Sequence, residues 1–201
     1  MSIETTSPKT RVRRSPEAAR ENILAAAEAL LVEQGPQAIK LADVAKTAGV
    51  VHANVIHHFG SIAGVETALM ERMIRRLADQ VIVGFDQEGA SPGFGAQALF
   101  DAFEEKGAAR LAAWLELTGE GRRMTLVRQV VDEVVDTRLA RDVGVERDAI
   151  VDFVLVNIIL AVGVGLFGPT LSELLGRPPE RARELALEMV QGRIRAMGGK
   201  G

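Results

Sequence analysis

Residues 41–59, LADVAKTAGVVHANVIHHF, decide the fold that this sequence predicts. The first half has the i, i+3, i+4, i+7 spacing of a helix with one apolar face, formed by Leu41, Val44, Ala45 and Ala48. Gly49 supplies a tight turn, and Val55 and Phe59 give the second helix an apolar face of its own. Two short helices joined by a turn that contains glycine are typical of the helix-turn-helix that reads DNA. The second helix carries no arginine or lysine.

Helices are predicted on both sides of this motif. Ser15 and Pro16 favour a helix start, with serine as the N-cap and proline in the first turn. That helix has an apolar stripe at i, i+4, i+7 and i+8, formed by Ile23, Ala27, Leu30 and Leu31. It is expected to stop at Gly35-Pro36. A fourth, long helix is predicted over residues 61–84, followed by a glycine-rich loop over residues 89–95.

The rest of the chain is also predicted to be helical. No stretch alternates polar and apolar residues, so no strand is expected. Helical segments are predicted near residues 96–106, 108–118, 122–141, 146–167 and 179–197. The expected fold is therefore all-α, with about nine helices. We expect a flexible arm over 1–14, a three-helix DNA-binding domain over 15–76, and a helical ligand-binding and dimerisation domain over 77–201.

Composition narrows the functional classes. The chain has no cysteine, which excludes disulfides and thiolate catalysis. The net charge is −3, but residues 1–76 carry +2 and the remainder −5, which fits a DNA-facing N-terminal end. The arm holds Arg11, Arg13 and Arg14. It is expected either to touch phosphate or the minor groove, or to act as a solubilising tail.

Taken together, these N-terminal helices resemble the DNA-binding domain of the TetR family of bacterial repressors. The resemblance covers roughly residues 17–75. It rests on five short segments of the sequence, namely residues 23–27, 33–35, 44–45, 48–50 and 57–59. It implies an all-helical C-terminal domain that binds a small apolar effector, and a homodimer formed through the last two helices.

The resemblance also assigns DNA-contacting positions. Its base-reading positions fall at His52 and Ala53. Its phosphate-contacting positions fall at Lys40, Asn54, His57 and His58.

The sequence departs from the family pattern at several positions in and around the recognition helix. Val51 replaces the usual serine or threonine at the start of the recognition helix, so no side-chain cap is expected there. Ile56 replaces an aromatic residue, and Ile62 replaces a phosphate-binding lysine. Lys40 stands where threonine is usual. Binding weaker than that of a typical member is expected, because phosphate contacts provide much of DNA affinity.

All three histidines of the chain lie in or beside the recognition helix. At about 100° per residue their side chains diverge, so no metal site is expected. Histidine becomes positively charged near pH 6.5. DNA affinity is therefore expected to rise as the pH falls from about 8 to about 6.

Two sets of residues in the C-terminal domain are candidates for ligand and partner contacts. Residues 152–166 are apolar nearly all round, which fits a dimer interface or a central core helix. The interface set is Phe153, Asn157, Leu160, Val164, Leu185 and Met189. An effector pocket is predicted around Phe100, Phe103, Trp114, Glu116, Met124 and Val127, although such stripes are often plain core.

The expected function is a ligand-responsive transcriptional repressor. It would bind a palindromic DNA operator as a homodimer and be released by a small apolar or amphipathic effector, without a cofactor. The alternative is a helical small-molecule-binding dimer with a degenerate, non-binding DNA motif. An enzyme is not expected, because no nucleophile motif or phosphate loop is present. A cytoplasmic location is expected, since the N-terminus lacks an apolar signal and the run at 153–169 is short for a membrane span.

Overall fold

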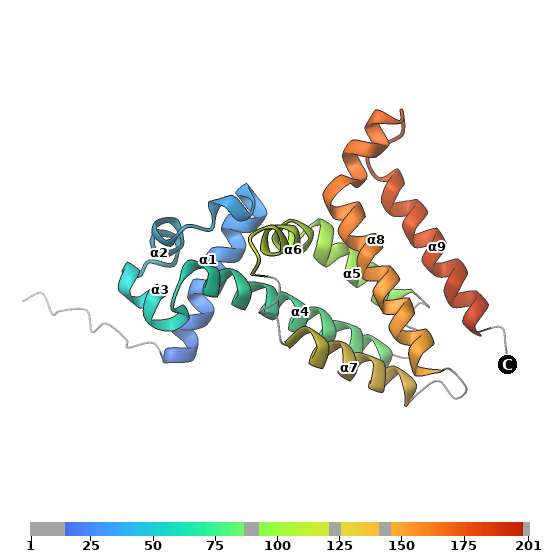
Figure 1. Ribbon diagram of the computed structural model, residues 1–201, viewed down its shortest axis with the longest axis horizontal. Coiled ribbons are helices and arrows are strands. Elements are labelled where there is room, and N and C mark those ends of the chain that lie inside the picture. Colours follow the sequence, from blue (N-terminus) through green and yellow to red (C-terminus); the bar gives the residue numbers. More distant parts are fainter. Residues whose placement is uncertain (1–14, 87–92, 121–125, 141–145, 199–201) are drawn as a thin grey trace, which may run out of the picture.

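The computed structural model describes residues 15–86, 93–120, 126–140 and 146–198 (Figure 1). Within these ranges the chain is all-α, as the sequence predicts, and contains nine α-helices, one short 3₁₀ helix and no strand. The helices are α1 (Pro16–Gln34), α2 (Leu41–Ala48), α3 (His52–Phe59), α4 (Ile62–Asp86), α5 (Phe94–Glu104), α6 (Ala108–Leu117), α7 (Leu126–Leu139), α8 (Arg147–Leu174) and α9 (Arg181–Gly198).

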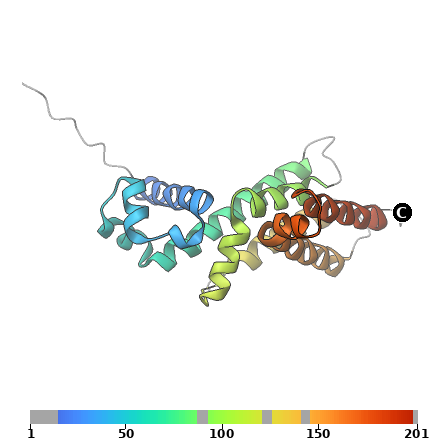
Figure 2. The same cartoon turned by 90° about the horizontal axis from the view of Figure 1, so that it is seen from above.

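Helices α1 to α3 form a small unit at one end of the molecule (Figures 1 and 2). Helix α1 starts as predicted, because the Ser15 hydroxyl accepts the Ala18 N–H at 3.2 Å and Pro16 occupies the first turn. It ends before Gly35, whose φ of 93° suits glycine. The predicted apolar stripe of α1 is buried, and it packs in one core with Val44, Val55 and Leu69.

Helix α4 runs from this unit into the rest of the molecule (Figure 1). Arg72 fixes it to α1 by donating to the Glu28 carboxylate at 2.7 Å and to the Leu24 carbonyl at 2.8 Å. Arg72 also pairs with Glu21, and its side chain is almost completely buried. A boundary at residue 76 falls inside this continuous helix, so the two expected domains share α4.

The C-terminal helices pack around α8. Helices α5, α6 and α9 lie against α8, and α7 lies along α4 (Figure 1). The approach of α8 is closest at Gly165, where an added Cβ would lie 2.8 Å from the Ala109 Cβ and 2.9 Å from the Phe103 carbonyl oxygen. Arg183 of α9 pairs with Asp101 and Glu104 of α5, which fixes α9 to the same body.

The predicted end of α8 at Gly168-Pro169 is wrong. The helix continues through Pro169 to Leu174, and α9 begins at Arg181. Proline removes one hydrogen bond and crowds the preceding turn, but the helix is held by packing on the side that faces α9. Gly168 and Ser172 are buried, and the Ser172 hydroxyl accepts the Ala182 N–H of α9 at 3.2 Å.

Candidate nucleic-acid interface

The helix-turn-helix forms where the sequence predicts it. Helix α2 ends at Gly49, whose φ of 65° is left-handed and whose N–H reaches the carbonyls of Ala45 and Lys46. Because β-carbon crowding disfavours this conformation, glycine is the suitable residue here. The side chain of Asn22 on α1 donates to the Ala48 carbonyl at 2.7 Å. The turn between the two helices is therefore held both by its own backbone and from α1.

The recognition helix α3 is anchored by a small part of its surface. Val55 is its one fully buried side chain, and Phe59 is half-buried against the same core. The helix has no side-chain cap at Val51, as the sequence predicts, and Val51 is 63% exposed. Most of α3 is therefore free to contact another molecule.

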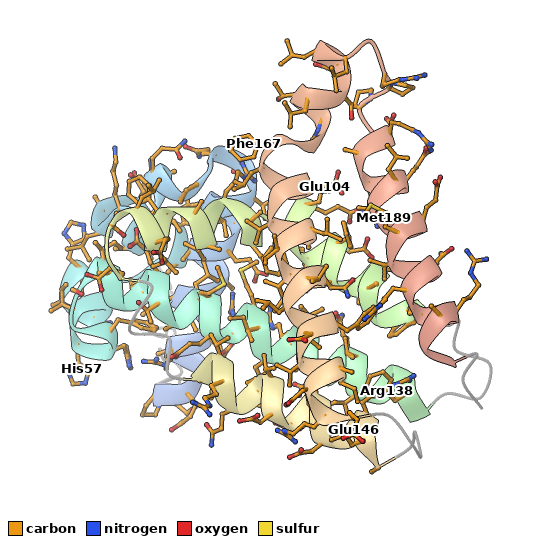
Figure 3. The ribbon with its side chains drawn as sticks, turned by 45° about the vertical axis from the view of Figure 1, so that its right-hand side comes forward. His57, Glu104, Arg138, Glu146, Phe167 and Met189 are labelled. Carbon is orange, nitrogen blue, oxygen red and sulfur yellow. The ribbon has the colours of Figure 1, made fainter. Side chains whose placement is uncertain are left out.

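Five of the residues assigned to DNA contact lie on α3: His52, Ala53, Asn54 and His57 are exposed, while His58 is half-buried. Lys40, which precedes α2, is also exposed. Figure 3 shows His57 at the outer end of the molecule, pointing away from the other helices. The residues Arg11, Arg13 and Arg14 of the predicted arm lie outside the described residues.

Two cations beside this surface were not among the predicted residues. Lys46 is exposed in the last turn of α2, and its place on the polar side of that helix is a signal that the sequence already contained. Arg20 comes from α1, and its Nη1 donates to the His58 carbonyl at 2.8 Å. These residues are 38 positions apart, so no local pattern pointed to this contact.

The start of α4 shows what replaces the missing lysine at residue 62. Ile62 packs against the hydrophobic core. The Ser61 hydroxyl accepts the Gly64 N–H at 3.0 Å and so caps the helix. A Cβ at Gly64 would lie 2.1 Å from the Phe59 carbonyl oxygen, so a larger residue does not fit this turn.

The predicted pocket residues lie in different environments. Phe100 and Phe103 are buried in the continuous core, whereas Glu116 is exposed and Val127 is half-buried. Met124 lies outside the described residues.

Trp114 links α6 to α4. Its indole N–H donates to the Glu66 carboxylate at 3.0 Å, and Glu66 is only 5% exposed. Burial raises the pKa of the Glu66 carboxyl, the Trp114 hydrogen bond lowers it, and the charge of Glu120 raises it further. The sequence did not single out Glu66, because an isolated acidic residue in a helix usually faces solvent.

Helices α8 and α9 expose an apolar face. The predicted interface residues divide between the two sides of this pair. Asn157 and Val164 are buried inside the protomer and so are not available to a partner, because α8 turns that side toward α5 and α6. Phe153 and Leu160 are half-buried, and Leu185 and Met189 are exposed. The exposed apolar residues of α8, which the sequence did not separate from the buried ones, are Leu155, Val156, Ile159, Phe167, Leu171 and Leu174.

The sequence of the N-terminal unit matches a known protein family. The profile of the bacterial regulatory proteins of the TetR family matches residues 23–68, which span α1 from its middle, the helix-turn-helix and the start of α4. The N-terminal unit therefore contains a TetR-type DNA-binding domain. Members of this family are DNA-binding transcriptional regulators, and the match supports that general role for the present protein.

Solved structures share the fold over most of the chain. A transcriptional regulator from Rhodococcus sp. Rha1 is 21% identical, with a TM-score of 0.60 over 88% of this chain and 96% of its own. A TetR-family regulator from Streptomyces coelicolor is 23% identical, with a TM-score of 0.56 over 90% of this chain and 98% of its own. The superantigen PfiT is 18% identical, with a TM-score of 0.53 over 87% of this chain and 97% of its own. No curated protein matched the chain.

Helix α8 packs into the C-terminal group of helices. Among the described residues, α8 is the one helix that is long and apolar enough to cross a membrane. Here it packs against α5, α6 and α9 and carries the buried Asn157, whose side chain donates to the Phe153 carbonyl at 2.7 Å. The length and composition of α8 are thus accounted for by packing on one side and by an exposed apolar face on the other.

Proposed function

We propose that this TetR-family protein is a cytoplasmic, homodimeric repressor that binds a palindromic operator and leaves it when a small apolar or amphipathic effector binds. The observation that carries the proposal is the outward surface of α3. Val55 anchors the helix, while His52, Ala53, Asn54 and His57 remain exposed at the outer end of the molecule. A helix presented in this way can enter the major groove.

The chemistry of α3 favours a particular kind of base readout. Arginine and lysine are the side chains that most often read guanine, and α3 contains neither. The helix offers instead the exposed Ala53 and Ile56, which is 41% exposed, and Val51 is exposed directly before its start. Apolar side chains recognise the methyl group of thymine. We therefore expect operator half-sites rich in A·T pairs where α3 enters the groove.

This expectation has a direct test. Replacing the thymines of the half-site by deoxyuridine removes only their methyl groups. The loss of each methyl group that α3 contacts is expected to lower the affinity for DNA about three- to fivefold, which corresponds to the free energy of burying one such group. Unchanged affinity after full replacement would contradict an apolar readout, and a half-site made of G·C pairs would do the same.

The apolar face of α8 and α9 supports the homodimer. Ile159 is 60% exposed and Leu174 is 76% exposed, and both belong to a row of exposed apolar residues on α8. Large apolar patches on soluble proteins mark interaction sites. A second copy is the proposed occupant, because a helix-turn-helix protein reads two half-sites roughly 34 Å apart with two recognition helices.

Effector response is proposed to pass through α6. Trp114 joins α6 to Glu66, which lies in the second turn of α4 and thus close to α3. Arg110 of α6 also donates to the Val32 carbonyl near the end of α1, at 3.2 Å. A ligand that displaces α6 would therefore move both helices that support α3. Only a ligand that binds the two arrangements differently shifts their populations.

The decisive experiment is selection of bound DNA from a random pool with the purified full-length protein. A shared palindromic sequence is expected, and it should compete with random DNA at physiological salt. Placing that sequence in a promoter should lower reporter expression, and an effector should restore it. If the recovered DNA has no common sequence at any salt concentration, the DNA motif is degenerate. The helical small-molecule-binding dimer then becomes the better description.

A further inference from the structure

The C-terminal end of the recognition helix is held by an arginine from another helix. Arg20 lies near the start of α1, and its Nη1 donates to the His58 carbonyl at 2.8 Å. The same guanidinium lies over the Phe59 ring, with its carbon atom 4.2 Å from the ring centroid. The Arg20 side chain therefore contacts two consecutive residues, His58 and Phe59, at the end of α3.

Both contacts suit the physics of a helix end. The last carbonyls of a helix have no partner within it, and they form the negative end of the helix dipole. A guanidinium satisfies such a carbonyl and carries the favourable charge. Its planar group also stacks on an aromatic face, which a lysine ammonium does not do in the same way. The arginine thus combines a cap with a stacking contact.

The contacts continue from Arg20 to the exposed histidines. The Phe59 and His58 rings meet edge to face with centroids 6.4 Å apart, and the His58 and His57 rings do so at 5.3 Å. Arg20, Phe59, His58 and His57 therefore form one row. A change at Arg20 would alter the orientation of the rings that the resemblance assigns to phosphate contact.

At this end of α3, the other contacts are the Gly60 N–H, which reaches the Ile56 carbonyl, and the packing of the half-buried Phe59 against the core. Val55 is the one fully buried residue of α3, and the start of the helix lacks a side-chain cap. Arg20 is also not committed to an acidic residue within the described part of the chain. The neighbouring Glu21 pairs instead with Arg72 and Arg76 of α4.

We propose that Arg20 is a positioning residue for DNA binding, which holds the end of α3 and the rings of His57 and His58 in the orientation that meets the phosphate backbone. This role rests on the proposed function. There are two competing explanations, which the test separates. Arg20 could contact phosphate directly, or it could contribute to overall stability alone.

The test compares Arg20→Lys with Arg20→Met, and uses Arg128→Met as the matched charge control, because the Arg128 side chain on α7 is 94% exposed and lies outside the proposed DNA and dimer surfaces. Affinity for the selected operator is measured across salt concentrations, well below the melting temperature of each variant. Both Arg20 variants are expected to bind about 5- to 10-fold more weakly, because both lose the stacked guanidinium. The salt dependence of Arg20→Lys should match that of the wild type.

A second measurement does not require DNA. All three histidines lie on α3, so the imidazole NMR signals of the free protein report on this helix alone. In Arg20→Lys the His58 and His57 signals are expected to shift more than those of His52. This result would support the positioning role even if no specific operator were found, which separates the failure of this proposal from that of the proposed function.

Three results would overturn the proposal. If Arg20→Lys binds like the wild type while Arg20→Met lowers the salt slope by about 0.9, Arg20 contacts phosphate directly. If both variants melt at lower temperature but bind normally when folded, its role is structural only. Unshifted His57 and His58 signals in Arg20→Lys would show that the arginine does not position these rings.

Discussion

Helices α3 and α8 are both incompletely covered in the protomer, but they expose opposite chemistry. Helix α3 presents histidine, asparagine and small apolar side chains around one buried valine. Helix α8 is more than three times as long and presents leucine, valine, isoleucine and phenylalanine. The polar surface suits hydrated, charged DNA, whereas the apolar surface suits another protein surface that excludes water.

In the proposed dimer, the function of α3 depends on the exposed face of α8 and α9. A single α3 contacts one half-site through few groups and carries no lysine or arginine. Two copies held together by α8 and α9 would combine two weak contacts into one strong one. The weaker the affinity of one recognition helix for its half-site, the more DNA binding depends on the dimer.

The largest effect is therefore expected from a change in α8. Ile159→Glu places a charge in the exposed apolar face, and burying it in a dimer is costly. The variant is expected to be a monomer of 21.6 kDa by light scattering. It should lose operator affinity by about 100-fold or more, because the second half-site contact is lost.

Val32→Glu is the control for this change, since Val32 is also an exposed apolar residue but lies on α1. It should remain a dimer of wild-type mass. A dimeric Ile159→Glu variant would show that the apolar face of α8 serves another purpose.

A second, smaller effect on operator affinity is expected from a change in the turn between α3 and α4. Gly64→Ala brings a Cβ to 2.1 Å from the Phe59 carbonyl oxygen, so the turn between α3 and α4 must shift. We expect a loss of about 1–3 kcal/mol in the free energy of unfolding, as for other overpacked sites. This corresponds to a melting temperature lower by roughly 2–12 °C, and operator affinity should fall as well.

Gly192→Ala is the matched control, because a Cβ there meets no atom within 4 Å in the protomer. It should melt at or slightly above the wild-type temperature, as alanine favours helix. Equal stability of the Gly64→Ala variant and the wild type would mean that α3 tolerates movement at this end.

The contact between α4 and α6 gives a third test. Glu66→Gln keeps an acceptor for the Trp114 indole but removes the buried charge. The pKa of Glu66 is raised in the folded protein, so the folded state binds this proton more tightly than the unfolded chain. The penalty for the charged form is therefore present above the raised pKa and absent below the unfolded pKa.

Glu66→Gln is accordingly expected to melt about 2–4 °C higher than the wild type near pH 8, with the difference closing toward pH 4. Glu116→Gln, on the exposed side of α6, controls for the loss of a surface charge. A constant difference at all pH values would indicate packing rather than charge as the cause.

The smallest effect concerns the two neighbouring rings at the end of α3. If His57 and His58 contact phosphate, the double variant His57→Ala and His58→Ala should bind the operator about fivefold more weakly, because hydrogen bonds to the phosphate backbone are lost. Wild-type affinity in that variant would assign the phosphate contacts to other groups.

Much of the fold followed from the sequence because its signals are local. The Ser15 cap, the turn at Gly49 and the apolar spacing of α1 and α2 each involve residues within one or two turns of helix. Such features form wherever backbone geometry and periodicity agree. The exposed positions of α3 followed in the same way, because Val55 marks the buried side.

The sequence-based predictions were wrong or incomplete where contacts between distant segments determine the structure. The sequence predicted an end of α8 at residue 167, but contacts of Gly168 and Ser172 with the start of α9 accompany the helix past Pro169. It could not tell which side of this apolar helix faces inward, so Asn157 and Val164 were assigned to the interface although they are buried. An all-round apolar helix has no periodicity that distinguishes its two sides.

The sequence by itself determined that the chain is all-helical, where its recognition helix lies, and that this helix lacks its own cations. Only the tertiary structure brought Arg20 onto the end of α3, Trp114 onto Glu66, and the apolar side of α8 to the surface. The physical reason is that periodicity and caps are properties of neighbouring residues. Contacts across 38 or 48 positions arise only when packed helices bring their side chains together.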